Sequence, residues 1–177
     1  LRTQYQWDER MRDIRTVFSI HNLRYQGIFN WADMNARLGL PEGLFTPDYL
    51  EFYGCLSCMK AGIVFADHVA TVSPSYAEEI KTDYYGERLD GLLRMRGNTV
   101  SGILNGIDTK AYDPAADPYL AAPFDAAKPE GKTICKSALQ REFGLAERPD
   151  TPVVGMISRL TPQKGFDLVE RVLSDIM

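Results

Sequence analysis

The chain has 177 residues, enough for one domain or slightly more at roughly 150 residues per domain. Its 20 Lys and Arg against 24 Asp and Glu give a formal net charge of −4, so it lacks the basic field that nucleic-acid and anionic-membrane binders use. The apolar runs are too short to cross a bilayer, the first residues contain no signal-peptide core, and three cysteines do not make a disulfide framework. We therefore expect a cytoplasmic protein that binds neither nucleic acid nor membranes.

Strand-like and helix-like segments alternate along the first part of the chain. Residues 1–15 resemble the end of a helix, and Arg15–Ile20 is a β-branched run typical of a strand. Residues 31–38 predict a short helix, and the largely apolar residues 48–66 predict a longer, mostly buried one. Residues 68–73 predict a second strand.

The second part of the chain repeats this pattern around one break. A short helix to Ile80 comes next, and residues 99–104 predict a third strand. Residues 113–130, rich in Pro, Ala and Asp, predict a connector. A helix is predicted at Gly131–Phe143, and the unbroken apolar residues 152–157 predict a strand buried on both faces. An amphipathic helix then runs to the end of the chain.

This alternation predicts an α/β fold with a parallel sheet. The connector marks the start of a second unit. One strand and one helix cannot cover both faces of a sheet, so we expect further sequence to complete that unit. We interpret the chain as a piece of a longer protein.

The strongest candidate site follows the last predicted strand, at Ser158–Gly165, where open α/β sheets bind ligands. Thr161 is a good N-cap and Pro162 suits the first helical position. Arg159 and Lys164 then place two cations at the positive end of a helix, which is unfavourable unless an anion lies between them. The segment predicts a diphosphate site, with two solvated surface charges as the alternative.

Two further loops after predicted strands carry polar residues. His21 and Asn22 follow the first strand and could hydrogen-bond a polar ligand, although a purely structural histidine explains them equally well. Asn105 opens an Asn-Gly turn after the third strand, which is a weak signal by itself. His68 starts a strand, and we interpret it as structural.

The sequence predicts no metal, redox or nucleophile site. Cys55 and Cys58 form a single C-x-x-C without the second pair of ligands that zinc needs, and we interpret them as small buried apolar residues. Ser73 lacks the glycines of a nucleophile elbow. Neither a G-x-G-x-x-G segment nor a Walker loop occurs.

Four motifs together match a known family. They are His21–Gly27 (HNLRYQG), Thr71–Ala77 (TVSPSYA), Gly102–Asp108 (GILNGID) and Ser158–Gly165 (SRLTPQKG). In this order and spacing they cover essentially the whole chain, and they resemble bacterial glycogen synthases of the ADP-glucose-dependent glycogen and starch synthase family. Each motif alone is weak, whereas the ordered set is specific.

The resemblance implies a GT-B glycosyltransferase, in which two doubly wound domains face each other across a cleft. Residues 1–104 would then end the N-terminal Rossmann-like domain, residues 105–150 would form the connector and a leading helix, and residues 151–177 would begin the C-terminal domain. Members of this family transfer glucose from ADP-glucose to the non-reducing end of an α-1,4-glucan such as glycogen, with retention of configuration and without a metal or other cofactor.

The resemblance also implies catalytic roles for three residues. Arg159 and Lys164 would bind the diphosphate of ADP-glucose and stabilise the charge on the departing ADP. His21 would contact the transferred glucose near its reacting carbon.

Three more residues are implied in substrate binding. Asn105 would lie near the sugar at the domain junction. Asn22 and Gln26 would help to shape the loop that faces the sugar.

Two family features are not found in these residues. The Lys-x-Gly-Gly-Leu loop belongs upstream, and the acidic residue and Gly-rich segments that hold the donor belong downstream. We therefore expect the 177 residues alone to be inactive. The alternatives are another GT-B glucosyltransferase that uses UDP-glucose, and a non-catalytic glucan-binding remnant.

Overall fold

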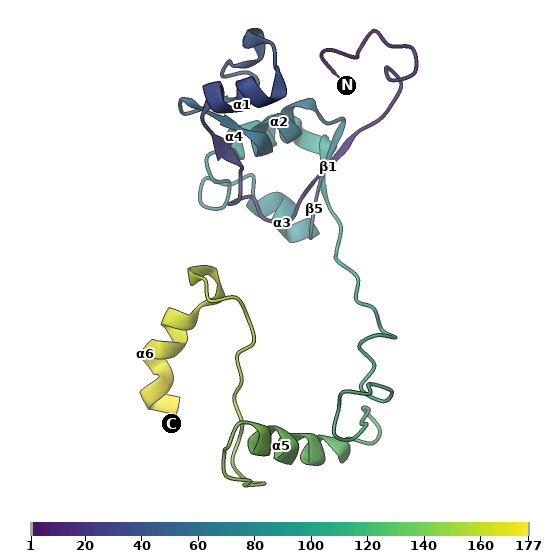
Figure 1. Ribbon diagram of the computed structural model, residues 1–177, viewed down its shortest axis with the longest axis vertical. Coiled ribbons are helices and arrows are strands. Elements are labelled where there is room, and N and C mark those ends of the chain that lie inside the picture. The colour runs from purple at the N-terminus through teal and green to yellow at the C-terminus, as the bar shows by residue number, and fades with distance from the viewer. Residues whose placement is uncertain (1, 177) are drawn as a thin grey trace. The chain divides into compact units, whose positions relative to one another are not determined.

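The computed structural model describes residues 2–176 (Figure 1). The chain forms two compact units, one ending at Gly106 and the other beginning at Ile107.

The first unit is built on a three-stranded parallel sheet. Its strands are β1 (Val17–Ile20), β5 (His68–Thr71) and β6 (Val100–Gly102), in the order β1-β5-β6. Val17 pairs with His68, and Val69 pairs with Val100. The predicted parallel α/β fold is confirmed.

Three helices pack with this sheet: α2 (Cys58–Phe65), α3 (Pro74–Glu79) and α4 (Asp90–Arg96). The helix α2 approaches the sheet closely, since a Cβ at Gly62 would lie 2.3 Å from the ring of Phe18 on β1. The buried core comprises Ile20, Leu23, Met59, Ile63, Val69, Ala77, Ile80, Leu89, Leu93 and Val100. Burial of this apolar surface is the main source of the unit's stability.

The predicted helix at 48–66 is wrong in its first half. An antiparallel hairpin of β3 (Glu51–Phe52) and β4 (Cys55–Ser57) precedes α2, and β2 (Ile28–Phe29) pairs with β4 on the other side. The chain reverses at Tyr53 and Gly54, whose φ angles of 51° and 82° end any helix there. Ser57 Oγ then caps α2 by accepting from Lys60 N at 3.1 Å.

Shorter elements complete the first unit. The helix α1 (Trp31–Leu38) lies where the sequence predicts it, and two 3₁₀ turns occur at Glu42–Leu44 and Gly97–Thr99. Residues 2–16 form turns rather than the end of a helix, so that prediction is wrong. This segment is held instead by side-chain contacts to Asp67.

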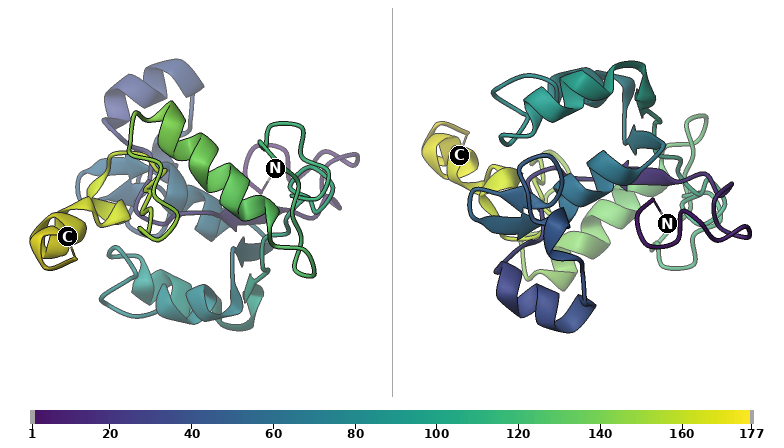
Figure 2. Two further views of the ribbon diagram at one scale, coloured as in Figure 1. Left: turned by 90° about the horizontal axis from the view of Figure 1, so that it is seen from below. Right: turned by 90° about the horizontal axis from the view of Figure 1, so that it is seen from above.

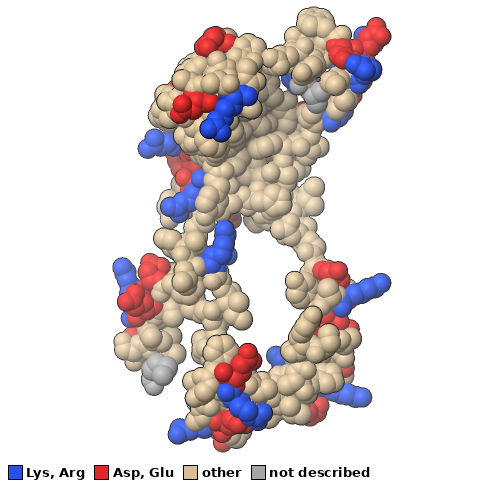
Figure 3. All heavy atoms as spheres, viewed as in Figure 1, with Lys and Arg blue, Asp and Glu red and all other residues tan. Residues whose placement is uncertain are grey.

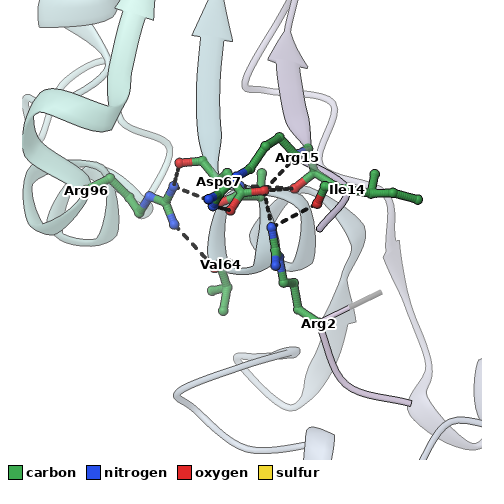
Figure 4. A network of polar contacts seen from close by, with 8 residues as sticks. Arg2, Ile14, Arg15, Val64, Asp67 and Arg96 are labelled. Atoms are coloured by element: carbon green, nitrogen blue, oxygen red, sulfur yellow. Dashed lines mark hydrogen bonds and ion pairs between the residues drawn. The ribbon is translucent and has the colours of Figure 1, made fainter. Parts of the chain in front are cut away.

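Asp67 ties the amino ends of β1 and β5 together (Figure 4). Its carboxylate accepts hydrogen bonds from the Arg2 guanidinium, from Thr16 N at 2.7 Å and from Thr16 Oγ1 at 3.0 Å. Arg96 donates to the backbone oxygens of Ala66 at 2.7 Å and Asp67 at 3.0 Å. The hydrogen bonds from Arg2 and Thr16 hold the pKa of the Asp67 carboxyl well below its usual value of 3.8.

The lowered pKa of Asp67 predicts acid-sensitive stability. Because the native carboxyl binds its proton less readily than the unfolded one, the charged group contributes fully to the free energy of unfolding above pH 3.8 and loses that contribution as the pH falls toward its native pKa. Asp67→Asn should therefore lower the urea midpoint of unfolding at neutral pH. The difference in midpoint between the variant and the wild type should become smaller below pH 3.8. A difference independent of pH would contradict this.

The second unit has two helices, α5 (Gly131–Glu142) and α6 (Phe166–Ile176), and a 3₁₀ turn at Pro162–Lys164. The connector at 113–130 and α5 lie where the sequence predicts them, and α6 is the predicted amphipathic helix but begins at Phe166 rather than at Pro162. In all three views α5 (green) and α6 (yellow) are joined by irregular chain (Figure 2).

The predicted buried strand at 152–157 is wrong. These residues are irregular, Val154 is 80% exposed, and Ile157 is fully exposed. A strand needs a hydrogen-bonded neighbour, and residues 107–176 contain no other strand.

No helix within residues 2–176 is long and apolar enough to cross a membrane. On the face of the molecule shown in Figure 3, Lys and Arg are interspersed with Asp and Glu. That face presents no large patch of a single charge.

Candidate functional site

The carboxyl edge of the parallel sheet gathers three of the sequence motifs. His21 follows β1, Ser73 follows β5, and Asn105 follows β6. Because the three strands are parallel and adjacent, their carboxyl ends meet at one edge of the sheet. This is the edge at which open α/β sheets bind ligands.

The loop after β1 is held by two hydroxyl groups, one on β5 and one on α3. Thr71 Oγ1 on β5 donates to the carbonyl oxygen of Ile20 at 2.8 Å in a buried bond. The Tyr76 hydroxyl on α3 accepts from Leu23 N at 3.2 Å. These two bonds bracket His21, whose side chain is exposed and whose Nε2 lies 3.4 Å from Ser19 Oγ. The backbone at His21 is therefore anchored while its ring faces solvent.

Asn22 shapes the same loop. Its Oδ1 accepts from Arg24 N at 3.1 Å, and its carbonyl oxygen accepts from Tyr25 N at 3.3 Å. This is an Asx-type turn, in which a short polar side chain replaces a backbone partner.

Gln26 is buried, with 9% of its surface exposed. Its Nε2 donates to Glu87 O at 2.8 Å, and its carbonyl oxygen accepts from Met59 N at 2.9 Å. Its Oε1 is buried and has no hydrogen-bond partner among the described residues. Gln26 thus joins the loop after β1 to α2 and to the turn before α4.

The turn from β5 to α3 requires a glycine in the neighbouring strand. A Cβ at Gly102 would lie 1.9 Å from Ser73 O, so only glycine fits there. Ser73 Oγ caps α3 by accepting from Tyr76 N at 2.9 Å. Ser73 is therefore a helix cap rather than an activated nucleophile.

Asn105 lies beyond β6 in an exposed, irregular segment. Asp108 ends this segment, its Oδ1 accepting from Ala111 N at 2.9 Å and Lys110 N at 3.0 Å. These backbone bonds hold the pKa of the Asp108 carboxyl below its usual value. The Asn-Gly signal marks a segment held at both ends, by the sheet and by an Asx turn.

The second unit carries Arg159 and Lys164. Both side chains are exposed, and neither makes an ion pair or side-chain hydrogen bond within residues 2–176. Thr161 N donates to Arg159 O at 2.8 Å and Lys164 N donates to Thr161 O at 2.9 Å, so the backbone turns twice between the two cations. Two unpaired cations on one short segment can bind an anion such as a diphosphate.

The prediction that Thr161 and Pro162 begin the last helix is wrong. Pro162 opens a 3₁₀ turn, Gly165 leaves it at φ 71°, and α6 begins only at Phe166. Lys164 therefore precedes α6, and the first turn of α6 carries Asp167, the sign that a helix N-terminus favours. Thr161 Oγ1 makes no capping bond. The two cations remain a candidate anion site, but not because they oppose a helix dipole.

The cysteine prediction is also wrong in part. Cys55 is half-buried on β4, while Cys58 is exposed at the first position of α2. Three extended steps of about 3.3 Å each separate their Cα atoms by roughly 10 Å, beyond the span of a disulfide. The residues described contain no cluster of three or more metal-ligating side chains.

Comparison with known proteins decides the family. The family model for the starch synthase catalytic domain matches residues 1–95. The chain belongs to this family. It is similar to the glycogen synthase of Geobacillus thermodenitrificans, with 51% identity over 177 residues that cover 100% of this chain and 36% of that protein. It is equally similar to the glycogen synthase of Anaeromyxobacter, covering 37% of it.

A solved structure supports the same assignment. The catalytic domain of starch synthase IV from Arabidopsis thaliana, bound to ADP and acarbose, matches 97% of this chain with a TM-score of 0.86 and 35% identity. The chain covers 36% of that structure. The GT-B resemblance is thereby confirmed, for a chain that spans about a third of the length of its relatives.

The buried bond from Thr71 to Ile20 gives a stability prediction. Thr71→Val keeps the shape but leaves a buried carbonyl without this donor, which should cost about 1–3 kcal/mol in the free energy of unfolding. Thr71→Ser keeps the hydroxyl and should lose about 0.8 kcal/mol for the missing methyl. Urea titration measures both. A valine variant as stable as wild type would show that the bond contributes nothing.

Proposed function

We propose that the whole protein transfers glucose from ADP-glucose to the non-reducing 4-hydroxyl of an α-1,4-glucan, with retention of configuration, in the cytoplasm. The observation that carries this is the alignment of the entire chain with glycogen synthases at 51% identity. The match to a starch synthase domain bound to ADP supports the choice of donor. Residues 1–104 would close the N-terminal domain, residues 105–150 would connect, and residues 151–177 would begin the C-terminal domain.

Arg159 and Lys164 would bind the donor's diphosphate. Support comes from their exposure and from the lack of competing ion pairs within the described residues. As the glucosyl bond breaks, negative charge accumulates on the departing ADP, and the two cations would stabilise it more than they stabilise the bound donor. Interactions that strengthen in this way lower the barrier to the chemical step.

His21 would contact the transferred glucose near its reacting carbon. The anchored backbone on either side of it supports this role, because a catalytic side chain must be held within a fraction of an ångström. Asn105 would contact the sugar from the neighbouring strand end. Asn22 and Gln26 would act on the loop's shape, in keeping with the turn of one and the burial of the other.

A chimera tests the proposal directly. This chain would replace the aligned 177 residues of the Geobacillus thermodenitrificans glycogen synthase, which supplies the rest of the protein. Incorporation of labelled glucose into glycogen from ADP-glucose, well above that from UDP-glucose, is the expected result. A folded chimera that transfers no glucose from ADP-glucose would refute the proposal.

In the chimera, Lys164→Ala should lower kcat by about 10²–10³, the scale of one lost electrostatic donor, with a smaller effect on KM. Lys128→Ala removes another exposed lysine of the same unit and should leave kcat unchanged. An unaltered kcat in Lys164→Ala would show that this residue does not stabilise the leaving group.

His21→Ala in the chimera should reduce turnover much more than it reduces the affinity for ADP, because the histidine is proposed to touch the sugar and not the nucleotide. Ser19→Ala, which removes only the neighbouring hydroxyl, is the matched control. Steady-state kinetics and ADP titration separate the two effects. Equal losses in turnover and ADP affinity would indicate a structural histidine.

A further inference from the structure

A groove lies on the first unit, and none of its lining residues belongs to the four sequence motifs. It has a volume of about 420 Å³, within the range of small-ligand sites. The β3–β4 hairpin contributes Phe52 and Tyr53, α2 contributes Lys60, and the turn before α4 and α4 itself contribute Arg88 and Met95. Its walls therefore combine aromatic, apolar and charged side chains.

An aromatic ring and a guanidinium group meet in this groove. Arg88 Cζ lies 4.9 Å from the centroid of the Tyr53 ring, and the centroids of the Phe52 and Tyr53 rings lie 4.8 Å apart with the rings nearly perpendicular. Tyr53 nevertheless remains 69% exposed. The chain holds a large ring at the surface without burying it.

Backbone strain is concentrated at the groove. Among residues 2–176, only three non-glycine residues have a positive φ: Tyr53 at 51°, Glu87 at 48° and Arg88 at 67°. Tyr53 and Arg88 line the groove, and Glu87 adjoins it. Residues that carry a Cβ are disfavoured in this region of φ, whereas glycine adopts it without a steric clash. Strained residues grouped around one concave surface are typical of functional sites.

Side-chain hydrogen bonds to backbone carbonyls hold both strained segments. Gln26 Nε2 holds the carbonyl oxygen of Glu87, and the Lys60 ammonium holds the carbonyl oxygens of Pro47 and, at 2.6 Å, Glu51. Through Gln26 the groove is joined to the loop that follows β1. The walls are therefore preorganised before any ligand arrives.

The charge of the groove favours a neutral ligand. The carboxylates of Asp48 and Glu51 offset the cations of Lys60 and Arg88, so no net field attracts a phosphate or another anion. A sugar chain satisfies both parts of the lining. Its C–H faces stack on an aromatic ring, and its hydroxyl groups exchange hydrogen bonds with carboxylate and guanidinium.

We propose that this groove binds a segment of an α-1,4-glucan chain, with the sugar on the exposed Tyr53 ring and Arg88 as its hydrogen-bond donor. The inference rests on the proposed function, which makes a glucan the acceptor. A glucan held here would be bound to the same unit that carries His21.

The test uses maltoheptaose as the probe and two variants that relieve strain. Arg88→Gly and Tyr53→Gly place glycine at positive φ, so both should fold, and Arg88→Gly should unfold at equal or higher urea concentration. Each should weaken maltoheptaose binding to the 177-residue chain by about fivefold or more. Tyr84→Ala is the control, since Tyr84 is 85% exposed, lies outside the groove lining and contacts Tyr85.

Isothermal titration and retardation in glycogen-containing native gels measure the binding. Loss in both glycine variants, with Tyr84→Ala unchanged, supports the groove. Wild-type chain that binds no maltoheptaose at millimolar concentration, or glycine variants that bind as tightly as wild type, would overturn it. Loss of binding in Tyr84→Ala as large as in the glycine variants would do the same.

This outcome is independent of the transferase assay. If the chimera transfers glucose but the groove variants bind maltoheptaose normally, the proposed glucan site is refuted and the proposed function stands. If the chimera transfers no glucose but the chain binds maltoheptaose through Tyr53 and Arg88, the proposed function is refuted and the glucan site stands.

Discussion

The pairing of β1 with β5 is the constraint on which the first unit depends. At the amino ends of these strands, Asp67 accepts from the backbone and side chain of Thr16 and from Arg2. At the carboxyl ends, Thr71 donates to the carbonyl oxygen of Ile20. The pair is thus closed by side-chain bonds at both ends, which fixes its register and delivers the next residue to the edge of the sheet.

The two edges of the sheet differ in their interactions. At the amino edge the charged side chains form ion pairs with one another and hydrogen bonds to the backbone, and these interactions contribute to stability. The carboxyl edge uses neutral hydroxyl bonds to hold its loops and leaves His21 and Asn105 exposed. In the other unit Arg159 and Lys164 are likewise uncommitted to protein partners within the described residues. Polar side chains that are not engaged in hydrogen bonds or ion pairs within the protein are the ones available to bind a substrate.

Local patterns in the sequence predicted the elements whose ends are set locally. The β-branched runs around β1, β5 and β6 and the helix α1 are of this kind. The helix prediction for residues 48–66 failed because their apolar composition suits a helix and a hairpin equally. The hairpin that forms around Tyr53 is completed by β2, which lies far from it in the sequence. The run at 152–157 is strand-like in composition but has no partner strand among residues 107–176.

The candidate site was partly predictable for the same reason. Its residues lie in short motifs with a typical chemistry, and strand order alone brings His21 and Asn105 to one edge. The residues that hold the loop after β1, namely Thr71, Tyr76 and Glu87, could not be predicted from the sequence. Each lies 51–61 residues from the group it binds and contributes only a single hydroxyl or carbonyl group. Nor did the sequence reveal the strained turn at the groove.

Amide hydrogen exchange of the chimera, with and without ADP-glucose and maltoheptaose, tests the central claim that the carboxyl edge of this sheet is the substrate-binding edge. We expect ligand-dependent protection in residues 21–26 and 103–106, with little change at Thr16 and Asp67 on the opposite edge. Ligand-dependent protection confined to the amino edge, or none in either loop of a chimera that binds both ligands, would contradict it.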